Sequence, residues 1–292
     1  MCCHKRLITI LLLFAYFILL SLPVSAEVKP GLLKVHFLDV GQGDSILMNT
    51  PSGKNILIDG GPPGSGKKII AYLKEKQINR IDLLITTHPD IDHIGGLPQV
   101  LKKVKVKQVV DSGKLHTTRT YAKYIQQIIK HDIPVRLAEK NELLRIDPLL
   151  TIRILNTYGT SKNNNQSSIA LKVTYDDIDL LLMSDVEMKQ EKEFLKSYDV
   201  NAEIIKVAHH GSNTSSSLDF LKAVSPETAI LTYSIENDYG HPVDRVIRNL
   251  YKVKSDIYST AVFGDLEIRS DGKSYLVLPS RDPLSNIRKE AG

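Results

Sequence analysis

Six residues in the first third of the chain carry four side chains that can bind a metal ion. Residues 88–93 place the imidazoles of His88 and His93 beside the carboxylates of Asp90 and Asp92, directly after a mostly apolar run. Carboxylates this close repel one another unless a cation lies between them. Two glycines follow at 95–96 and let the backbone turn sharply into a helix. The spacing therefore predicts a metal-binding loop at the end of a strand.

Two further sets of metal-capable side chains also follow apolar runs. Asp185 comes after one such run, and His209 and His210 come after the next. In open α/β sheets, sites form at the carboxyl ends of the strands. If the three strands share a sheet and a direction, their ends meet at one edge. A buried histidine or a helix-capping aspartate is the commoner role for any one of these residues, but three sets together favour a metal site.

The elements that must position these residues are expected to alternate between strand and helix. We expect strands at 33–38, 45–49, 55–58, 82–86, 108–110, 169–174, 178–183, 204–208, 229–232 and two more around 256–268. Helices are expected at 67–77, from about 94 to 101, and at 118–130, 187–196, 216–224 and 243–253, with a polar loop at 156–167. This mixed order, with hairpins at both ends, predicts two sheets packed inside helices.

The motifs resemble those of the metallo-β-lactamase superfamily, whose metal-binding motif is HxHxDH. His88, Asp92 and His93 match that motif, and Asp90 stands where the family has its second histidine. Matching segments cover nearly all of residues 33–275, at 37–45, 58–61, 165–168, 184–187, 207–212 and 239–242. In this order they resemble the metallo-β-lactamase-like domain of ComEC-type competence proteins, the channels that import DNA.

The resemblance implies an α/β fold, the four-layer αβ/βα sandwich, with two divalent metal ions, zinc or manganese. The metal ligands that it implies are His88, Asp90, Asp92, His93, Asp185 as the bridge, and His209. The catalytic residues would be Asp92, Asp185 and His210, and the substrate-binding residues Asp44, Ser168, Ser212, Asn213 and His241. His210 or His241 could exchange roles with His209, because the family's histidine between the first motif and the bridging aspartate has no evident counterpart.

Such a metal pair predicts a hydrolase, because paired cations lower the pKa of a bound water and neutralise charge on a phosphoryl or carbonyl oxygen. The carboxylate of Asp90 suits manganese or magnesium better than a second imidazole would, and zinc remains open. The resemblance implies that the substrate is DNA. One alternative is hydrolysis of a small ester, lactone or phosphodiester on the same fold. A second is a non-catalytic DNA-binding relative, which would need damaged ligands.

Two surface segments could bind phosphate groups. Residues 211–215 could present backbone N–H groups and hydroxyls where a helix begins near Ser216, although serine and threonine also act as ordinary helix caps. A run of four lysines could follow a nucleic-acid backbone, although such runs more often form a solvated face or an edge strand. These lysines are Lys102, Lys103, Lys105 and Lys107.

A competing motif lies at 61–67, which fits the GxxxxGK pattern of nucleotide-binding loops. Lys68 follows Lys67, where that motif needs a hydroxyl to hold magnesium. A nucleotide site would also leave the cluster at 88–93 unexplained. We therefore expect no nucleotide cofactor. His116 lies in the interval where the family places a further histidine, but its setting indicates a loop, and we expect it at the surface and not as a ligand. His36 and His131 carry no motif and are expected to be structural or exposed.

The amino terminus has the pattern of a secretory signal peptide at 1–26: two basic residues, an apolar run at 7–20, and small residues at 24–26. An uncleaved membrane anchor is the alternative, because the run approaches the length that spans a bilayer. We expect one extracytoplasmic domain at 27–280, without membrane contact after cleavage, and a flexible tail at 281–292. Cleavage would remove both cysteines and so exclude disulfides and cysteine-bound zinc. The net charge of +5 permits an anionic substrate such as DNA without requiring one.

Overall fold

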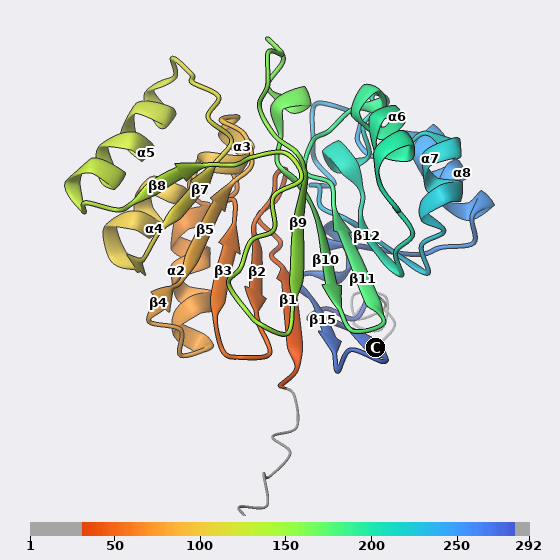
Figure 1. Cartoon of the computed structure of the whole chain (residues 1–292), viewed down its shortest axis with the longest axis horizontal. Coiled ribbons are helices and arrows are strands. Elements are labelled where there is room, and N and C mark those ends of the chain that lie inside the picture. Colours follow the sequence, from red (N-terminus) through yellow and green to blue (C-terminus); the bar gives the residue numbers. More distant parts are fainter. Residues whose placement is uncertain (1–30, 284–292) are drawn as a thin grey trace, which may run out of the picture. The chain divides into compact units, whose positions relative to one another are not determined.

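The computed structural model describes residues 31–283, in which two β-sheets pack face to face between two layers of helices (Figure 1). The eight-stranded sheet has the order β16 (Tyr275–Pro279), β15 (Leu266–Ser270), β1 (Leu33–Phe37), β2 (Ile46–Asn49), β3 (Asn55–Ile58), β5 (Leu83–Thr86), β7 (Val109–Asp111) and β8 (Val135–Leu137). The six-stranded sheet has the order β14 (Asp256–Ser259), β13 (Thr228–Leu231), β12 (Ile204–Lys206), β11 (Ile178–Leu182), β10 (Ala170–Tyr175) and β9 (Thr151–Asn156). Two short strands, β4 (Arg80–Ile81) and β6 (Lys105–Val106), form a separate pair.

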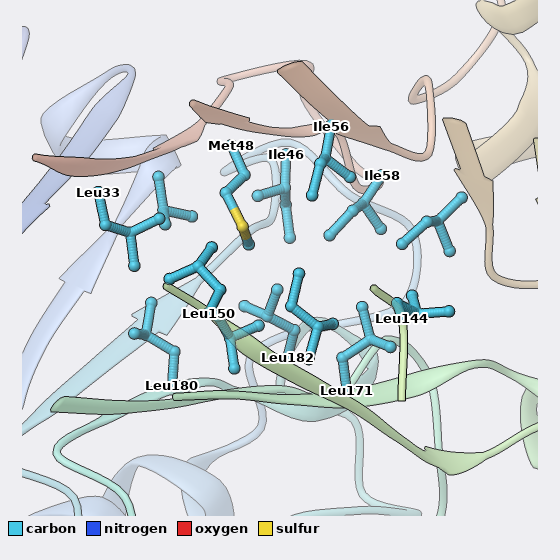
Figure 2. Packing of buried hydrophobic residues seen from close by; sticks show 14 of the residues in the cluster. Leu33, Ile46, Met48, Ile56, Ile58, Leu144, Leu150, Leu171, Leu180 and Leu182 are labelled. Atoms are coloured by element: carbon cyan, nitrogen blue, oxygen red, sulfur yellow. The ribbon is translucent and has the colours of Figure 1, made fainter. Parts of the chain in front are cut away.

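Alternation along the strands explains why the layers stack in this way. Side chains in a strand point to opposite faces in turn, so in β5 Leu83 and Ile85 enter the core between the sheets while Leu84 faces the helices. Because both faces are covered, β5 is buried throughout, and its first three residues are apolar. Figure 2 shows the inner core, where Met48 and Ile56 of the larger sheet lie opposite side chains of the smaller one.

Three helices cover the outer face of each sheet. The eight-stranded sheet packs against α2 (Ser65–Glu75), α4 (Leu97–Lys103) and α5 (Arg119–Lys130). The six-stranded sheet packs against α6 (Met188–Ser197), α7 (Leu218–Val224) and α8 (Asp244–Lys252). The short helices are α3 (Ile91–Ile94), α9 (Thr260–Phe263), and the 3-10 turns η1 (Asn165–Ser167) and η2 (Ala208–Gly211). The expected four-layer αβ/βα sandwich is confirmed.

Three strands of these sheets were not expected from the sequence: β8, β9 and β16. β8 is exposed, and β16 lies at the edge of its sheet with little burial, so neither has the apolar pattern of a central strand. The three ligand-bearing strands do not share one sheet, so their ends meet across the two sheets instead of along one edge. β5 belongs to the larger sheet, whereas β11 and β12 are parallel neighbours in the smaller one.

Only part of each predicted terminal segment is described. Residues 1–26 lie outside the described range, and so do residues 284–292 of the predicted tail. Arg281 is attached, because its N–H donates to the Phe263 carbonyl at 2.8 Å and its guanidinium lies 3.2 Å from Asp39. Within residues 31–283, no helix is long and apolar enough to cross a bilayer.

Candidate metal centre

The first ligand loop, residues 87–96, follows β5 and is held in place by hydrogen bonds to the Asp59 side chain. The Asp59 carboxylate is fully buried and accepts bonds from the Thr87 N–H at 2.8 Å and the Thr87 hydroxyl at 2.6 Å. It also accepts from His93 Nδ1 at 2.8 Å, which directs the other ring nitrogen, Nε2, away from Asp59. Asp90 begins α3, and its carbonyl accepts the N–H groups of His93 and Ile94.

Glycines allow this loop to pack tightly on the segment before α2. The Gly60 N–H donates to the His93 carbonyl at 2.6 Å, and a Cβ on Gly96 would lie 2.3 Å from the Gly60 oxygen. A Cβ on Gly66 would meet the Gly96 carbonyl at 2.6 Å, while Lys67 is exposed. Gly66 of the GxxxxGK segment is therefore explained by backbone contact with the metal-binding loop.

Asp185 lies at the middle of the cluster, just after β11. Its Oδ2 atom is 3.3 Å from His93 Nε2, 3.7 Å from His210 Nε2, 3.7 Å from His209 Nε2 and 3.8 Å from His88 Nε2. The two sheets thus bring together side chains that lie about a hundred residues apart.

The second ligand loop, residues 207–217, follows β12 and carries two strained histidines. His209 and His210 have φ of 50° and 54°, in the left-handed region that non-glycine residues rarely occupy. His210 Nδ1 donates to the Thr232 carbonyl at 2.6 Å, so its Nε2 faces Asp92 Oδ2 at 3.4 Å. His209 is less buried, and its Nε2 lies 3.4 Å from the Asn165 side-chain amide.

Several buried polar atoms of the cluster have no hydrogen-bond partner: His88 Nε2, His93 Nε2, His210 Nε2 and Asp185 Oδ1. Buried polar atoms without partners are rare in folded proteins, because each loses its hydration without replacement. Ligand atoms of Asp92, His93, Asp185 and His210 all lie within 4.8 Å of one another. This donor set fits a divalent cation.

The charges of the cluster also suit a cation. Burial would raise the pKa of Asp185, but His93 and His210 outweigh it and hold that pKa well below its usual value. Burial opposes ionisation of Asp92 as well, and His93 nevertheless lowers its pKa. Both carboxylates are therefore ionised at neutral pH and can bind a cation.

Asp90, the departure from the family motif, faces the same cluster. Its Oδ2 lies 3.5 Å from His88 Nε2, and its Oδ1 accepts from the Asn164 amide at 2.6 Å. The loop between β9 and β10 thus contributes two amides, Asn164 to Asp90 and Asn165 to His209. The 165–168 segment matched the family in sequence, but its amides were not recognised as neighbours of the ligands.

Five backbone N–H groups of the second ligand loop, which could have bound an anion, already have partners in the protein. The N–H groups of Ser212, Thr214 and Ser215 bond within the loop. Those of Ser216 and Ser217 donate to the carboxylate of Glu191, so an anion already occupies this position. These N–H groups are therefore not available to a phosphate, and the helix-capping role of the serines fits this turn. Helix α7 begins at Leu218, capped by the Ser217 hydroxyl.

The other predicted substrate-binding residues are distributed around the cluster. Asn213 is exposed and accepts from Arg245 at 3.0 Å. Ser168 is buried, with a hydroxyl that has no partner. His241 packs edge-on to His209, and burial lowers its pKa to about 4, with His209 adding to the effect. Asp44 is 2% exposed and bonded to interior groups, so it lies behind the cluster and does not face a substrate.

The predicted DNA-tracking lysines lie away from the cluster. Lys105 belongs to β6, which pairs with β4 at the amino end of β5, whereas the first ligand loop follows the carboxyl end of β5. Lys107 lies 2.8 Å from Asp82. The exposed-face interpretation fits this run. His131 is exposed, whereas His36 is buried on β1.

Sequence reasoning missed Lys206, a lysine with no exposed surface at the end of β12. Its position within an otherwise apolar strand was the available signal. Asp59, which supports the first ligand loop, was missed as well.

A model of the metallo-beta-lactamase superfamily matches residues 38–234. ComE operon protein 3 of Bacillus subtilis (strain 168) is 28% identical over 269 residues, which are 85% of this chain and 35% of that protein. Competence protein ComA of Neisseria gonorrhoeae is 30% identical over 216 residues, 71% of this chain and 28% of that protein. The chain therefore spans about a third of the length of these competence proteins.

A solved structure supports the same fold. The metallo-beta-lactamase fold protein YhfI of Bacillus subtilis aligns with a TM-score of 0.57 at 14% identity, covering 82% of this chain and all of that one. Fold, motif order and the family match agree, and the similarity to competence proteins extends over most of the chain. The chain belongs to the metallo-beta-lactamase superfamily, a family of metal-dependent hydrolases, and its relatives include competence proteins of the ComEC type.

Proposed function

We propose that this protein is an exported metal-dependent nuclease that hydrolyses DNA phosphodiester bonds. The observation that carries the proposal is the convergence of unpartnered buried atoms of His88, His93, His210 and Asp185 on one point. The names of the competence-protein relatives support DNA as the polymer concerned. Because the chain covers about a third of those proteins, the assignment is made for this domain alone.

Two divalent ions would be held by six residues: His88, Asp90, Asp92, His93, Asp185 and His210. When bound, such ions activate water and neutralise the charge that develops on a phosphoryl oxygen. Asp59 orients His93, and the Thr232 carbonyl orients His210, so that both Nε2 atoms face the cluster. The carboxylate of Asp90, in place of a second imidazole, favours manganese over zinc.

A cleft of about 720 Å³ opens beside Asp90 and suits a polyanion. Lys114 and Lys162 line it, and Lys162 is exposed. Lysines at this position can neutralise the backbone phosphates on either side of the bond to be cut. The larger cavity, about 770 Å³ beside His36 and Lys34, lies near the start of β1 and β3, at the opposite end of the strands from the ligand loops.

The test is an activity screen with each of manganese, zinc and magnesium. Substrates are linear duplex DNA, single-stranded DNA, bis-nitrophenyl phosphate, a lactone and a cephalosporin. We expect DNA cleavage that is lost in Asp185→Asn and in His93→Ala. His131→Ala is the matched control, because this histidine is exposed and remote from the cluster. Raised salt should weaken DNA binding if the cleft lysines contact phosphates.

The other outcomes separate the alternative functions. Turnover of the lactone or the cephalosporin with DNA intact would assign a small-molecule hydrolase. DNA binding without cleavage under every metal would assign a binding module.

Export rests on the sequence of residues 1–26, which lie outside the described range. Amino-terminal sequencing of the protein recovered outside the cytoplasm tests it, and we expect cleavage after Ala26. An intact amino terminus in the membrane fraction would show an anchor instead.

A further inference from the structure

We propose that Lys206 is a positioning residue that sets the geometry of the metal centre through Asp44. The inference rests on the proposed function in one respect: it assumes that the same side chains bind metal ions. Lys206 touches neither ion nor substrate in this assignment. It acts from behind the cluster, where no family motif in the sequence indicated a role for it.

The burial of Lys206 calls for a specific reason. Its side chain has no exposed surface, and its Nζ lies 2.5 Å from Asp44 Oδ2 and 3.5 Å from the Ser184 carbonyl. Removing an ammonium and a carboxylate from water costs several kcal/mol each, and a well-packed apolar pair of the same size is often as stable or more stable. A buried ion pair is therefore weak evidence for stability, and its contacts must be examined for another role.

Asp44 transmits the position of Lys206 to His210. Its Oδ1 accepts from the Thr232 hydroxyl at 2.6 Å, and the Thr232 carbonyl accepts from His210 Nδ1 at 2.6 Å. Because Nδ1 donates to the Thr232 carbonyl, Nε2 is the nitrogen of His210 that faces Asp92 and Asp185 and could bind an ion. Asp44 Oδ1 itself is 3.7 Å from His210 Nδ1, too far for a hydrogen bond while Lys206 and Thr232 hold the carboxylate.

The same pair contacts the other two ligand-bearing segments. The backbone N–H of Asp44 donates to the Asp92 carbonyl at 3.2 Å, and Lys206 approaches the carbonyl of Ser184, the residue before Asp185. Ser184 itself has φ of 46°, an unfavourable backbone state that its neighbours must hold. Lys206 and Asp44 thus connect segments of both sheets that must keep fixed spacing to bind ions.

The test compares single and double variants that separate positioning from stability. Lys206→Met keeps the length of the side chain and leaves Asp44 buried without its cation. Lys206→Met/Asp44→Asn removes both charges, so most of the lost stability should return. Lys172→Met is the matched control, because Lys172 is a mostly buried lysine 2.9 Å from Asp179, on strands β10 and β11.

Three quantities are measured for each purified protein: manganese affinity by calorimetry, the free energy of unfolding in urea, and the imidazole ¹⁵N shifts that report which nitrogen of His210 carries the proton. We expect roughly 10- to 100-fold weaker manganese binding in both Lys206 variants, and a changed His210 tautomer population. The control should bind manganese as the unmutated protein does.

The proposal is overturned if the double variant regains both stability and manganese affinity, since Lys206 would then be structural alone. It is also overturned if Lys206→Met binds manganese normally, or if the unmutated protein binds no divalent ion. Failure of the nuclease assignment can be distinguished from failure of this proposal. If the unmutated protein binds manganese but cuts no DNA, the manganese affinities of the Lys206 variants can still be compared with its own.

Discussion

The two ligand loops reach the same point by different means. The first, residues 87–96, has its metal-capable side chains within six residues, and one buried carboxylate, Asp59, holds both Thr87 and His93. The second, residues 207–217, presents His210 through a strained backbone and is closed by Glu191 and Arg245. A loop like the first can be predicted from the spacing of its residues in the sequence. A loop like the second cannot, because its geometry depends on residues that are distant in the sequence.

The largest effect is expected at Asp185, because this residue joins the two loops. Asp185→Asn keeps the shape but removes the charge that lies within 3.8 Å of four histidine Nε2 atoms. We expect loss of stoichiometric metal, measured by elemental analysis after dialysis against manganese or zinc. Asp179→Asn, on the strand β11 that precedes Asp185, is the control and should retain metal. Normal metal content in Asp185→Asn would show that the loops bind ions independently.

The next prediction compares the two histidines of the second ligand loop. His210→Ala should weaken metal binding more than His209→Ala, because only His210 belongs to the group of four whose ligand atoms lie within 4.8 Å of one another. His209 Nε2 already lies beside the Asn165 amide. Calorimetric titration with manganese measures both variants. A larger loss in His209→Ala would restore the assignment of His209 as the ligand that the sequence suggested.

The support of the first ligand loop is tested by Asp59→Asn. An amide that donates to His93 Nδ1 would force the His93 proton onto Nε2, the atom that faces Asp185. We expect roughly 10- to 100-fold weaker metal binding and a loss of about 1–3 kcal/mol in the free energy of unfolding. Ser45→Ala, a nearby buried residue that bonds only the Asp59 carbonyl, is the control. Unchanged metal affinity would limit Asp59 to folding.

The same contrast between the two ligand loops determines how much of the site can be predicted from the sequence. Strand ends and local spacing were sufficient to predict the first ligand loop, Asp185 and the histidine pair. Two sheets were predicted, but which strands belong to which sheet was not, because parallel pairing of β11 with β12 and of β5 with β7 depends on long-range contacts. The choice between His209 and His210 depends on the Thr232 carbonyl, 22 residues away in sequence.

Residues whose roles depend on burial were missed for the same reason. Lysine is usually a surface residue. Only the position of Lys206 at the end of an apolar strand indicated that it is buried. The turn after Gly211 had the composition of an anion site, but Glu191, on a separate helix, already accepts its N–H groups. Composition predicts what a turn can bind, and the rest of the fold decides what it does bind.

Glu191→Gln tests the closure of the second ligand loop. The glutamine amide retains one oxygen acceptor for the N–H groups of Ser216 and Ser217 but loses the charge. We expect about 1 kcal/mol lower stability at neutral pH, as for loss of a hydrogen bond to a charged group, and metal affinity within a factor of a few of the unmutated protein. A loss of metal comparable to that in Asp59→Asn would show that both loops depend equally on their supports.

The smallest effect is the pH dependence of that same variant. Burial raises the pKa of Glu191 above its usual 4.5, although the Ser217 and Ser216 donors and Arg245 act in the opposite direction. An acid with a raised pKa in the folded state favours folding most when protonated, so its contribution falls as pH rises from about 4.5 through the folded pKa. Glutamine does not titrate. The stability advantage of the unmutated protein over Glu191→Gln should therefore be larger at pH 4 than at pH 7 in urea unfolding, and an advantage that grows with pH would mean that the hydrogen-bond donors outweigh burial.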